Sequence, residues 1–147
     1  MTKKDNNKII SVVHSICCGL DVHKNMVSAC IIITEADGQQ SFVVKEFSTF
    51  TDDLFRLKQW LLTHKCPVVA MESTSVYWRP VHNVLEDSVQ VIWVNAKHVK
   101  NVPGRKTDIS DSMWLASLVR IGVLKASFIP EKRIRQLQEL VMLRKSY

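Results

Sequence analysis

The chain has 147 residues, which is enough for one domain with a hydrophobic core and too few for two full domains. Hydrophobic residues make up 46% of it and charged residues 23%, a globular composition that argues against a disordered chain. The net charge of +6 is unevenly spread, because residues 1–90 hold 9 basic and 10 acidic side chains whereas residues 91–147 hold 11 basic and 4 acidic ones. This basic second half indicates a polyanionic partner, nucleic acid first and a membrane surface second, with a solvated basic face as the alternative.

Membrane insertion and secretion are disfavoured by the apolar pattern. No apolar run reaches the roughly 18–20 residues of a membrane-spanning helix. Ile9–Leu20 follows several lysines, as a signal peptide would, but polar residues interrupt it and a buried strand is the better interpretation. The chain has four cysteines and no C-x-x-C pair, which fits free thiols in a reducing cytosol: Cys17, Cys18, Cys30 and Cys66. A zinc site of His14, Cys17 and His23 is a minor alternative, since its spacing matches no common zinc pattern.

The first half of the chain reads as strands. Residues 1–14 are predicted to be a polar tail and lead-in. Three strand-like runs with short connections follow and predict an antiparallel meander: Ser15–Val22, Met26–Thr34 and Ser41–Phe47.

The second half alternates helices and strands. Leucines at helical spacing behind Thr51, a candidate N-cap, predict a helix to about His64. The elements predicted after it are a strand (Pro67–Met71, with Glu72 at its end), a helix (Ser75–Leu85, irregular at Pro80), a strand (Val89–Val94), a basic loop (97–107), a helix (Asp108–Ile121, closed by Gly122), an extended stretch (123–129) and a last helix from Pro130.

This order of elements predicts an α/β fold. Three antiparallel strands followed by β-α-β units give a mixed five-strand sheet flanked by helices, in which the first and fourth strands are neighbours. We expect residues 15–125 to form this domain and residues 126–147 to begin a helical, coiled-coil segment.

Four acidic residues fall at positions that can form one site. Asp21 lies near the end of the first strand, Glu72 ends the fourth, and Asp108 and Asp111 stand three apart at the start of a helix, on one face. Clustered carboxylates repel one another unless a cation neutralises them, and hard oxygen ligands suit Mg²⁺ or Mn²⁺. Two such ions can act on a phosphodiester. Each residue also has a structural alternative, as a turn former, a helix-entry acid, an N-cap or a first-turn acid.

The sequence resembles the DEDD transposases of the insertion-sequence-110 family. The resemblance rests on three blocks in order, GLDVHK (19–24), ESTSVYW (72–78) and KTDISD (106–111), and on the stretch 115–130; it covers roughly residues 16–147. It implies an RNase H-like fold related to the Holliday-junction resolvase RuvC. It places the acidic tetrad, which serves as catalytic residues and metal ligands, on Asp21, Glu72, Asp108 and Asp111.

The resemblance also implies a function. Family members carry out Mg²⁺-dependent DNA cleavage and strand exchange in transposition, guided by a structured RNA made from the element's own ends. The expected place is the prokaryotic cytoplasm, at the nucleoid. Ser75 stands where the family commonly has Gly and Ser112 where it commonly has Ala, and neither departure affects the tetrad. The family's C-terminal domain with its nucleophilic serine has no counterpart here, so we expect a fragment or a truncated product and assign no serine that role.

Two basic segments are candidates for nucleic-acid binding. Lys97, Lys100, Arg105 and Lys106 precede Asp108 in a stretch without acids that could hold a phosphate backbone; a solvated loop is the alternative. In the last helix, Arg133 and Arg135 flank an apolar stripe (Ile134, Leu137, Leu140 and Val141) that fits either a coiled coil touching nucleic acid or packing on its own domain. The resemblance implies the coiled coil, which assembles a homo-oligomer.

Two other functions compete with a metal-dependent nuclease. The chain could bind guide RNA or DNA without catalysis, because the serine domain is missing. A phosphate-binding domain of the sugar-kinase or actin type shares the core topology and an early strand-end Asp. The lack of a Gly-rich phosphate loop and the pair Asp108 and Asp111 count against it.

Overall fold

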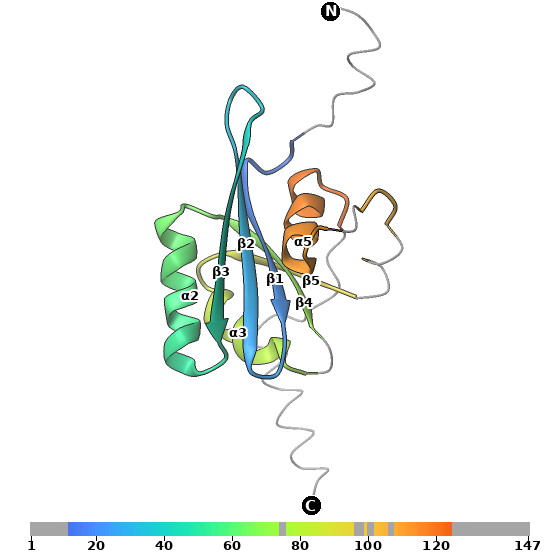
Figure 1. Ribbon diagram of the computed structural model, residues 1–147. Coiled ribbons are helices and arrows are strands. Elements are labelled where there is room, and N and C mark those ends of the chain that lie inside the picture. The colour runs from blue at the N-terminus through green and yellow to red at the C-terminus, as the bar shows by residue number, and fades with distance from the viewer. Residues whose placement is uncertain (1–11, 74–75, 96–98, 100–101, 106–107, 125–147) are drawn as a thin grey trace, which may run out of the picture.

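A five-stranded sheet forms the centre of the protein. The computed structural model describes residues 12–73, 76–95, 99, 102–105 and 108–124. In these ranges the elements are β1 (Ile16–Val22), β2 (Met26–Thr34), β3 (Gln40–Ser48), α2 (Thr51–Thr63), β4 (Val68–Ser73), α3 (Trp78–Leu85), β5 (Gln90–Val94) and α5 (Asp111–Arg120). The sheet order is β3-β2-β1-β4-β5, with β1 in the middle (Figure 1). The predicted mixed sheet, with its first and fourth strands adjacent, is confirmed.

The direction of the strands decides which ends meet. β1, β2 and β3 pair antiparallel, as the predicted meander requires, whereas β1 pairs parallel with β4 and β4 parallel with β5. Parallel strands present their carboxyl ends at the same edge of a sheet. The last residues of β1 and β4 therefore share one edge.

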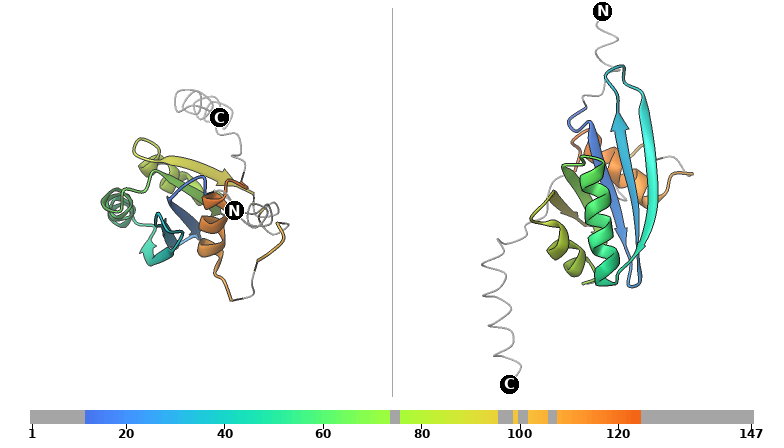
Figure 2. Two further views of the ribbon diagram at one scale, coloured as in Figure 1. Left: turned by 90° about the horizontal axis from the view of Figure 1, so that it is seen from above. Right: turned by 90° about the vertical axis from the view of Figure 1, so that its left-hand side faces the viewer.

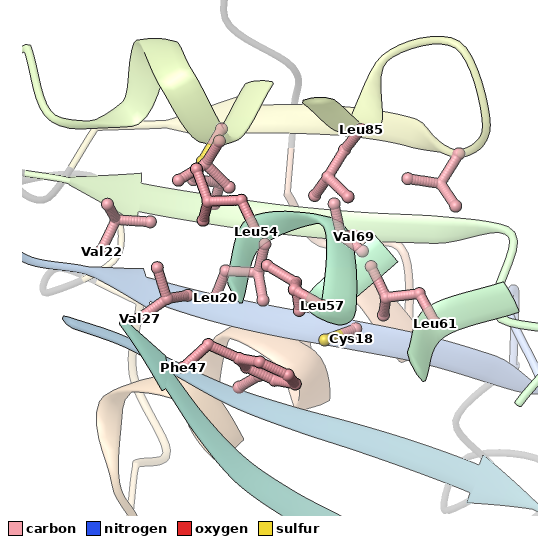
Figure 3. Packing of buried hydrophobic residues seen from close by; sticks show 14 of the residues in the cluster. Cys18, Leu20, Val22, Val27, Phe47, Leu54, Leu57, Leu61, Val69 and Leu85 are labelled. Carbon is pink, nitrogen blue, oxygen red and sulfur yellow. The ribbon is translucent and has the colours of Figure 1, made fainter. Parts of the chain in front are cut away.

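Helices α2 and α3 cover one face of the sheet (Figure 2). Leu54, Leu57 and Leu61 recur at helical spacing on α2 and are all buried. In Figure 3 these leucines and Leu85 of α3 point at Leu20 and other apolar side chains of the strands. Full burial of a leucine side chain contributes about 1.5–3 kcal/mol, so this layer is a major source of stability.

Helix α5 covers the opposite face of the sheet (Figure 2). Its residues Leu115, Ala116 and Val119 belong to a second buried cluster with Cys17 of β1 and Ala70 of β4. The adjacent cysteines of β1 thus face opposite layers, with Cys18 in the first cluster. All four cysteines are free and buried. Burial raises the pKa of the Cys17 thiol to about 12, which leaves it protonated and unreactive at neutral pH.

The end of α5 agrees with the prediction from the sequence, whereas its beginning does not. Gly122 has a φ of 74°, and the N–H of Val123 donates to the carbonyl of Leu118 over 3.0 Å, as in a Schellman cap. The predicted start at Asp108 is wrong. The Ser110 side chain accepts a hydrogen bond from the N–H of Met113 over 3.3 Å, so Ser110 is the N-cap and the helix begins at Asp111.

The starts of the other helices also differ from the predictions. α3 begins at Trp78 rather than Ser75, so Pro80 lies in the first turn, where no backbone N–H is required of it. The N-cap of α2 is Phe50 rather than Thr51, and it makes no side-chain cap. Instead, the Asp53 carboxylate reaches back and accepts hydrogen bonds from the N–H and hydroxyl of Ser48, over 3.0 and 2.6 Å.

Part of the predicted structure lies outside the described residues, namely the extended stretch beyond Leu124 and the helix from Pro130 with its apolar stripe. In the ranges that are described, none of the helices combines the length and the apolar character that crossing a membrane requires.

Candidate metal and nucleic-acid site

Two carboxylates meet where β1 and β4 end. The parallel register sets Asp21 directly opposite Glu72. Side chains alternate along a strand, so Asp21 shares the α5 face with Cys17, and Glu72 shares it with Ala70. The Asp21 side chain is only 12% exposed. The predicted adjacency of these two strand ends is therefore present in the fold.

The ionised form of Glu72 is disfavoured at this position. Burial raises the pKa of Glu72 above its ordinary range, and the negative charge of Asp21 and a hydrogen bond between the two side chains raise it further. Asp111 adds a smaller effect in the same direction, and His23 opposes it. Among the groups that act on Glu72, the burial and the two carboxylates that raise its pKa outweigh His23, which lowers it. A bound cation would relieve this repulsion.

His23 is the direct partner of Asp21. Its Nε2 lies 2.9 Å from Oδ2 of Asp21, and its side chain is 52% exposed. The spacing of two residues at the end of a strand places both side chains on the same side, a signal in the sequence that pointed to this contact. The alternative zinc site is not supported, because within the described residues His14, Cys17 and His23 do not gather into a group that could hold a metal ion.

Gly19 brings α5 directly onto β1. A Cβ atom at this position would lie 2.1 Å from the carbonyl oxygen of Ser112 and 2.6 Å from the backbone nitrogen of Ala116. The helix backbone therefore rests on the strand backbone, which only glycine permits. This contact fixes the beginning of α5 beside the end of β1. We did not identify Gly19 from the sequence, although a glycine within an otherwise apolar strand is a recognised sign of close backbone approach.

The beginning of α5 carries the third carboxylate. Asp111 is the first residue of the helix, its side chain is 55% exposed, and Nη2 of Arg105 donates to its Oδ1 over 2.7 Å. Asp108 is exposed and lies in the turn before the helix. The prediction that both aspartates share one helical face is therefore wrong, because the Ser110 cap excludes Asp108 from the helix.

The remaining predicted site residues are less completely described. Arg105 is the described member of the predicted nucleic-acid-binding set; the others, Lys97, Lys100, Lys106, Arg133 and Arg135, lie outside the described residues. Within the described ranges, no three His, Cys, Asp or Glu side chains gather closely enough to hold a metal ion. The donor chemistry still fits Mg²⁺ or Mn²⁺, because Asp21 and Glu72 offer adjacent hard oxygen ligands and Asp111 lies near enough to influence Glu72.

The fold is similar to that of RuvC. The structure of a Thermus thermophilus RuvC in complex with a Holliday-junction substrate matches with a TM-score of 0.51 and 13% identity, over 76% of this chain and 99% of that one. A second T. thermophilus RuvC structure matches with a TM-score of 0.44 and 16% identity, over 79% of this chain and 85% of that one. The fowlpox virus Holliday-junction resolvase matches with a TM-score of 0.43 and 16% identity, over 54% of this chain and 60% of that one. No curated protein sequence matches the chain.

The family follows from the sequence itself. The family model of the insertion-sequence-110 DEDD proteins, described as a transposase, matches residues 18–147. The chain belongs to this transposase family.

Proposed function

We propose that this chain carries the nuclease domain, over residues 15–125, of a transposase that cleaves DNA and transfers strands with Mg²⁺ or Mn²⁺. The observation that carries the proposal is the register pair of Asp21 and Glu72 on the central strands, with the raised pKa of Glu72. Buried like charges cost stability, and a protein retains them where a cation or a reaction needs them. Membership of the transposase family supports DNA as the substrate.

In this proposal the four acids share the binding of the metal. Asp21 and Glu72 provide oxygen ligands from the rigid sheet, and Asp111 and Asp108 provide them from the start of α5 and the turn before it. When bound, the metal stabilises the charge that develops on the phosphodiester and activates the attacking oxygen. Within the protein, His23 holds one oxygen of Asp21 and so orients the carboxylate, as partners of metal ligands commonly do.

The basic residues supply the path for the nucleic acid. In this proposal Arg105, Lys97, Lys100 and Lys106 contact the phosphate backbone beside the acidic site, and Arg133 and Arg135 extend the contact along the C-terminal segment. A structured guide RNA selects the DNA, and the C-terminal segment assembles the homo-oligomer. The chain acts on DNA at the nucleoid in the cytoplasm. The excess of basic residues over 91–147 supports a polyanionic partner for this half of the chain.

Metal binding by the full chain tests the site. Electron paramagnetic resonance of free Mn²⁺ measures its affinity for the wild type, Asp21→Asn and Glu72→Gln. We expect each substitution to weaken binding at least tenfold, because each removes a charged ligand at nearly constant shape. Asp53→Asn is the control, since Asp53 is a carboxylate on α2 that pairs with Arg56 and is not part of the proposed site. If both site variants bind Mn²⁺ as the wild type does, the proposed ligands are wrong.

DNA processing tests the activity. With Mn²⁺ present, the full-length transposase should process a branched DNA substrate and its Asp21→Asn variant should not, while both bind it with the same salt dependence. Binding with a steep salt slope and no cleavage by the wild type would favour the alternative of a nucleic-acid-binding chain without catalysis.

A further inference from the structure

Arg105 is hydrogen-bonded to Asp111, one of the carboxylates assigned to the proposed metal site. The same guanidinium nitrogen, Nη2, donates to Oδ1 of Asp111 and to the carbonyl oxygen of Ile109, each over 2.7 Å. These two contacts tie Arg105 to the start of α5. The Asp111 carboxylate is thereby paired with the guanidinium of Arg105. In the proposed site this same carboxylate joins Asp21 and Glu72.

The start of α5 packs on Gly19 of β1, which brings Asp111 close enough to the acidic pair for its charge to act on Glu72. The charge of Asp111 raises the pKa of Glu72, yet Asp21 has the larger influence and also forms a hydrogen bond with Glu72. In the described residues no third carboxylate completes a metal-binding group. The arrangement is therefore two carboxylates in place and a third one close by, held by Arg105.

We propose that Arg105 is a positioning residue that couples nucleic-acid binding to metal binding. In the free protein Arg105 pairs with Asp111; when a phosphate backbone approaches, the guanidinium exchanges Asp111 for a phosphate and releases the carboxylate to the metal. Guanidinium groups bind carboxylates and phosphates in the same planar geometry, so the exchange replaces one charge-assisted contact with another. This inference rests on the proposed function of the acidic site.

The contact is suited to exchange because it is exposed. The Arg105 side chain is 34% exposed and that of Asp111 55%. Exposed ion pairs are weak, and their measured energies correspond to a gain in affinity of about two- to fivefold. A phosphate can therefore displace Asp111 at little cost. By linkage, the same factor must appear in both directions: nucleic acid increases metal affinity, and metal increases nucleic-acid affinity.

The experiment measures Mn²⁺ affinity of the full chain by electron paramagnetic resonance, with and without a short DNA duplex. Without DNA, we expect Arg105→Ala to bind Mn²⁺ about two- to fivefold more tightly than the wild type. With DNA, the gain in Mn²⁺ affinity that DNA gives the wild type should shrink by the same factor. The salt slope of DNA binding should fall by about one, as expected for the loss of one phosphate contact.

Removing a positive charge near a cation site can increase metal affinity by itself, so a double-mutant cycle with Asp111→Asn separates the two causes. If Arg105 acts through Asp111, Arg105→Ala has no effect in the Asp111→Asn background. If the gain persists there, simple repulsion explains it and the coupling role is refuted. Arg56→Ala is the matched control, because it removes an exposed arginine paired with Asp53 on α2, and it should leave Mn²⁺ affinity unchanged.

The outcome also distinguishes this inference from the function on which it rests. Loss of Mn²⁺ binding in Asp21→Asn and Glu72→Gln, together with unchanged affinity in Arg105→Ala, would refute the coupling and leave the metal site intact. Wild-type binding in Asp21→Asn and Glu72→Gln would refute the metal site itself.

Discussion

Replacing Gly19 by alanine tests the contact that holds α5 on the sheet. The added Cβ would lie 2.1 Å from the Ser112 oxygen, 2.6 Å from the Ala116 nitrogen and 2.7 Å from Cβ of Leu115. Two of these three neighbours are backbone atoms, so no side-chain rotation can relieve the overlap. The helix must retreat from β1 by more than an ångström before the Ser112 oxygen reaches ordinary contact distance.

The cost of this retreat is large for a domain of this size. Overpacking a core costs about 1–3 kcal/mol, and a gap of about 0.5–1 Å forfeits a quarter to a half of each dispersion contact that α5 makes elsewhere. We therefore expect Gly19→Ala to lower the free energy of unfolding by about 3 kcal/mol or more, out of a typical total of about 5–15 kcal/mol.

Urea denaturation followed by tryptophan fluorescence and circular dichroism measures this change. Gly38→Ala is the matched control: Gly38 has a φ of 90° with nothing within 4 Å of an added Cβ, so it carries backbone strain without overlap. Strain alone should cost about 1–2 kcal/mol. A Gly19→Ala variant within about 0.5 kcal/mol of the wild type would refute the close approach of α5 to β1.

Three further predictions concern the acidic pair, the cap of α5 and the core. Because the folded state raises the pKa of Glu72, the ionised form of this carboxyl group destabilises the fold. In metal-free buffer Glu72→Gln should therefore raise the melting temperature at pH 7. The difference in melting temperature should vanish as the pH falls below about 4, where the Glu72 carboxyl group of the wild type is protonated in the folded and the unfolded state. An advantage that persists in acid would contradict it. Ser110→Ala should cost about 1 kcal/mol in urea denaturation through loss of the N-cap, and no loss would mean that the cap contributes nothing. Leu57→Ala, at a fully buried position, should cost about 2–5 kcal/mol, whereas Leu62→Ala on the exposed side of α2 should cost under about 1 kcal/mol; equal losses would contradict the assigned face.

The sheet was predictable because buried strands have recognisable runs of apolar residues in the sequence. β2 was predicted with its observed bounds, since Val27, Ile31 and Ile32 are buried between two covered faces. The adjacency of Asp21 and Glu72 followed from the strand order alone. In parallel neighbours, the residues at the carboxyl ends must meet whatever the details of packing.

The start of α5 was not predictable in the same way. Asp108, Ser110 and Asp111 are all acceptable N-terminal residues of a helix, and their propensities differ by less than packing energies. The choice of Ser110 is coupled to the placement of α5 on Gly19, a contact between residues nearly a hundred positions apart. The pairing of Arg105 with Asp111 depends in turn on that start. Local pattern thus identified the candidate acids, and tertiary contacts decided how they are arranged.

The acidic residues of the proposed site stand on two kinds of support, buried strands and an exposed helix end. Asp21 and Glu72 stand on strands whose neighbouring side chains are buried on both faces, so their backbone positions are fixed by packing that a ligand cannot alter. Asp111 stands on a helix end and is held by one exposed ion pair, so its position depends on what competes for Arg105. In the site as proposed, two ligands are fixed and the third is held by Arg105, so the site can respond to a polyanion without any movement of the sheet. In this proposal nucleic acid determines when the metal site is complete.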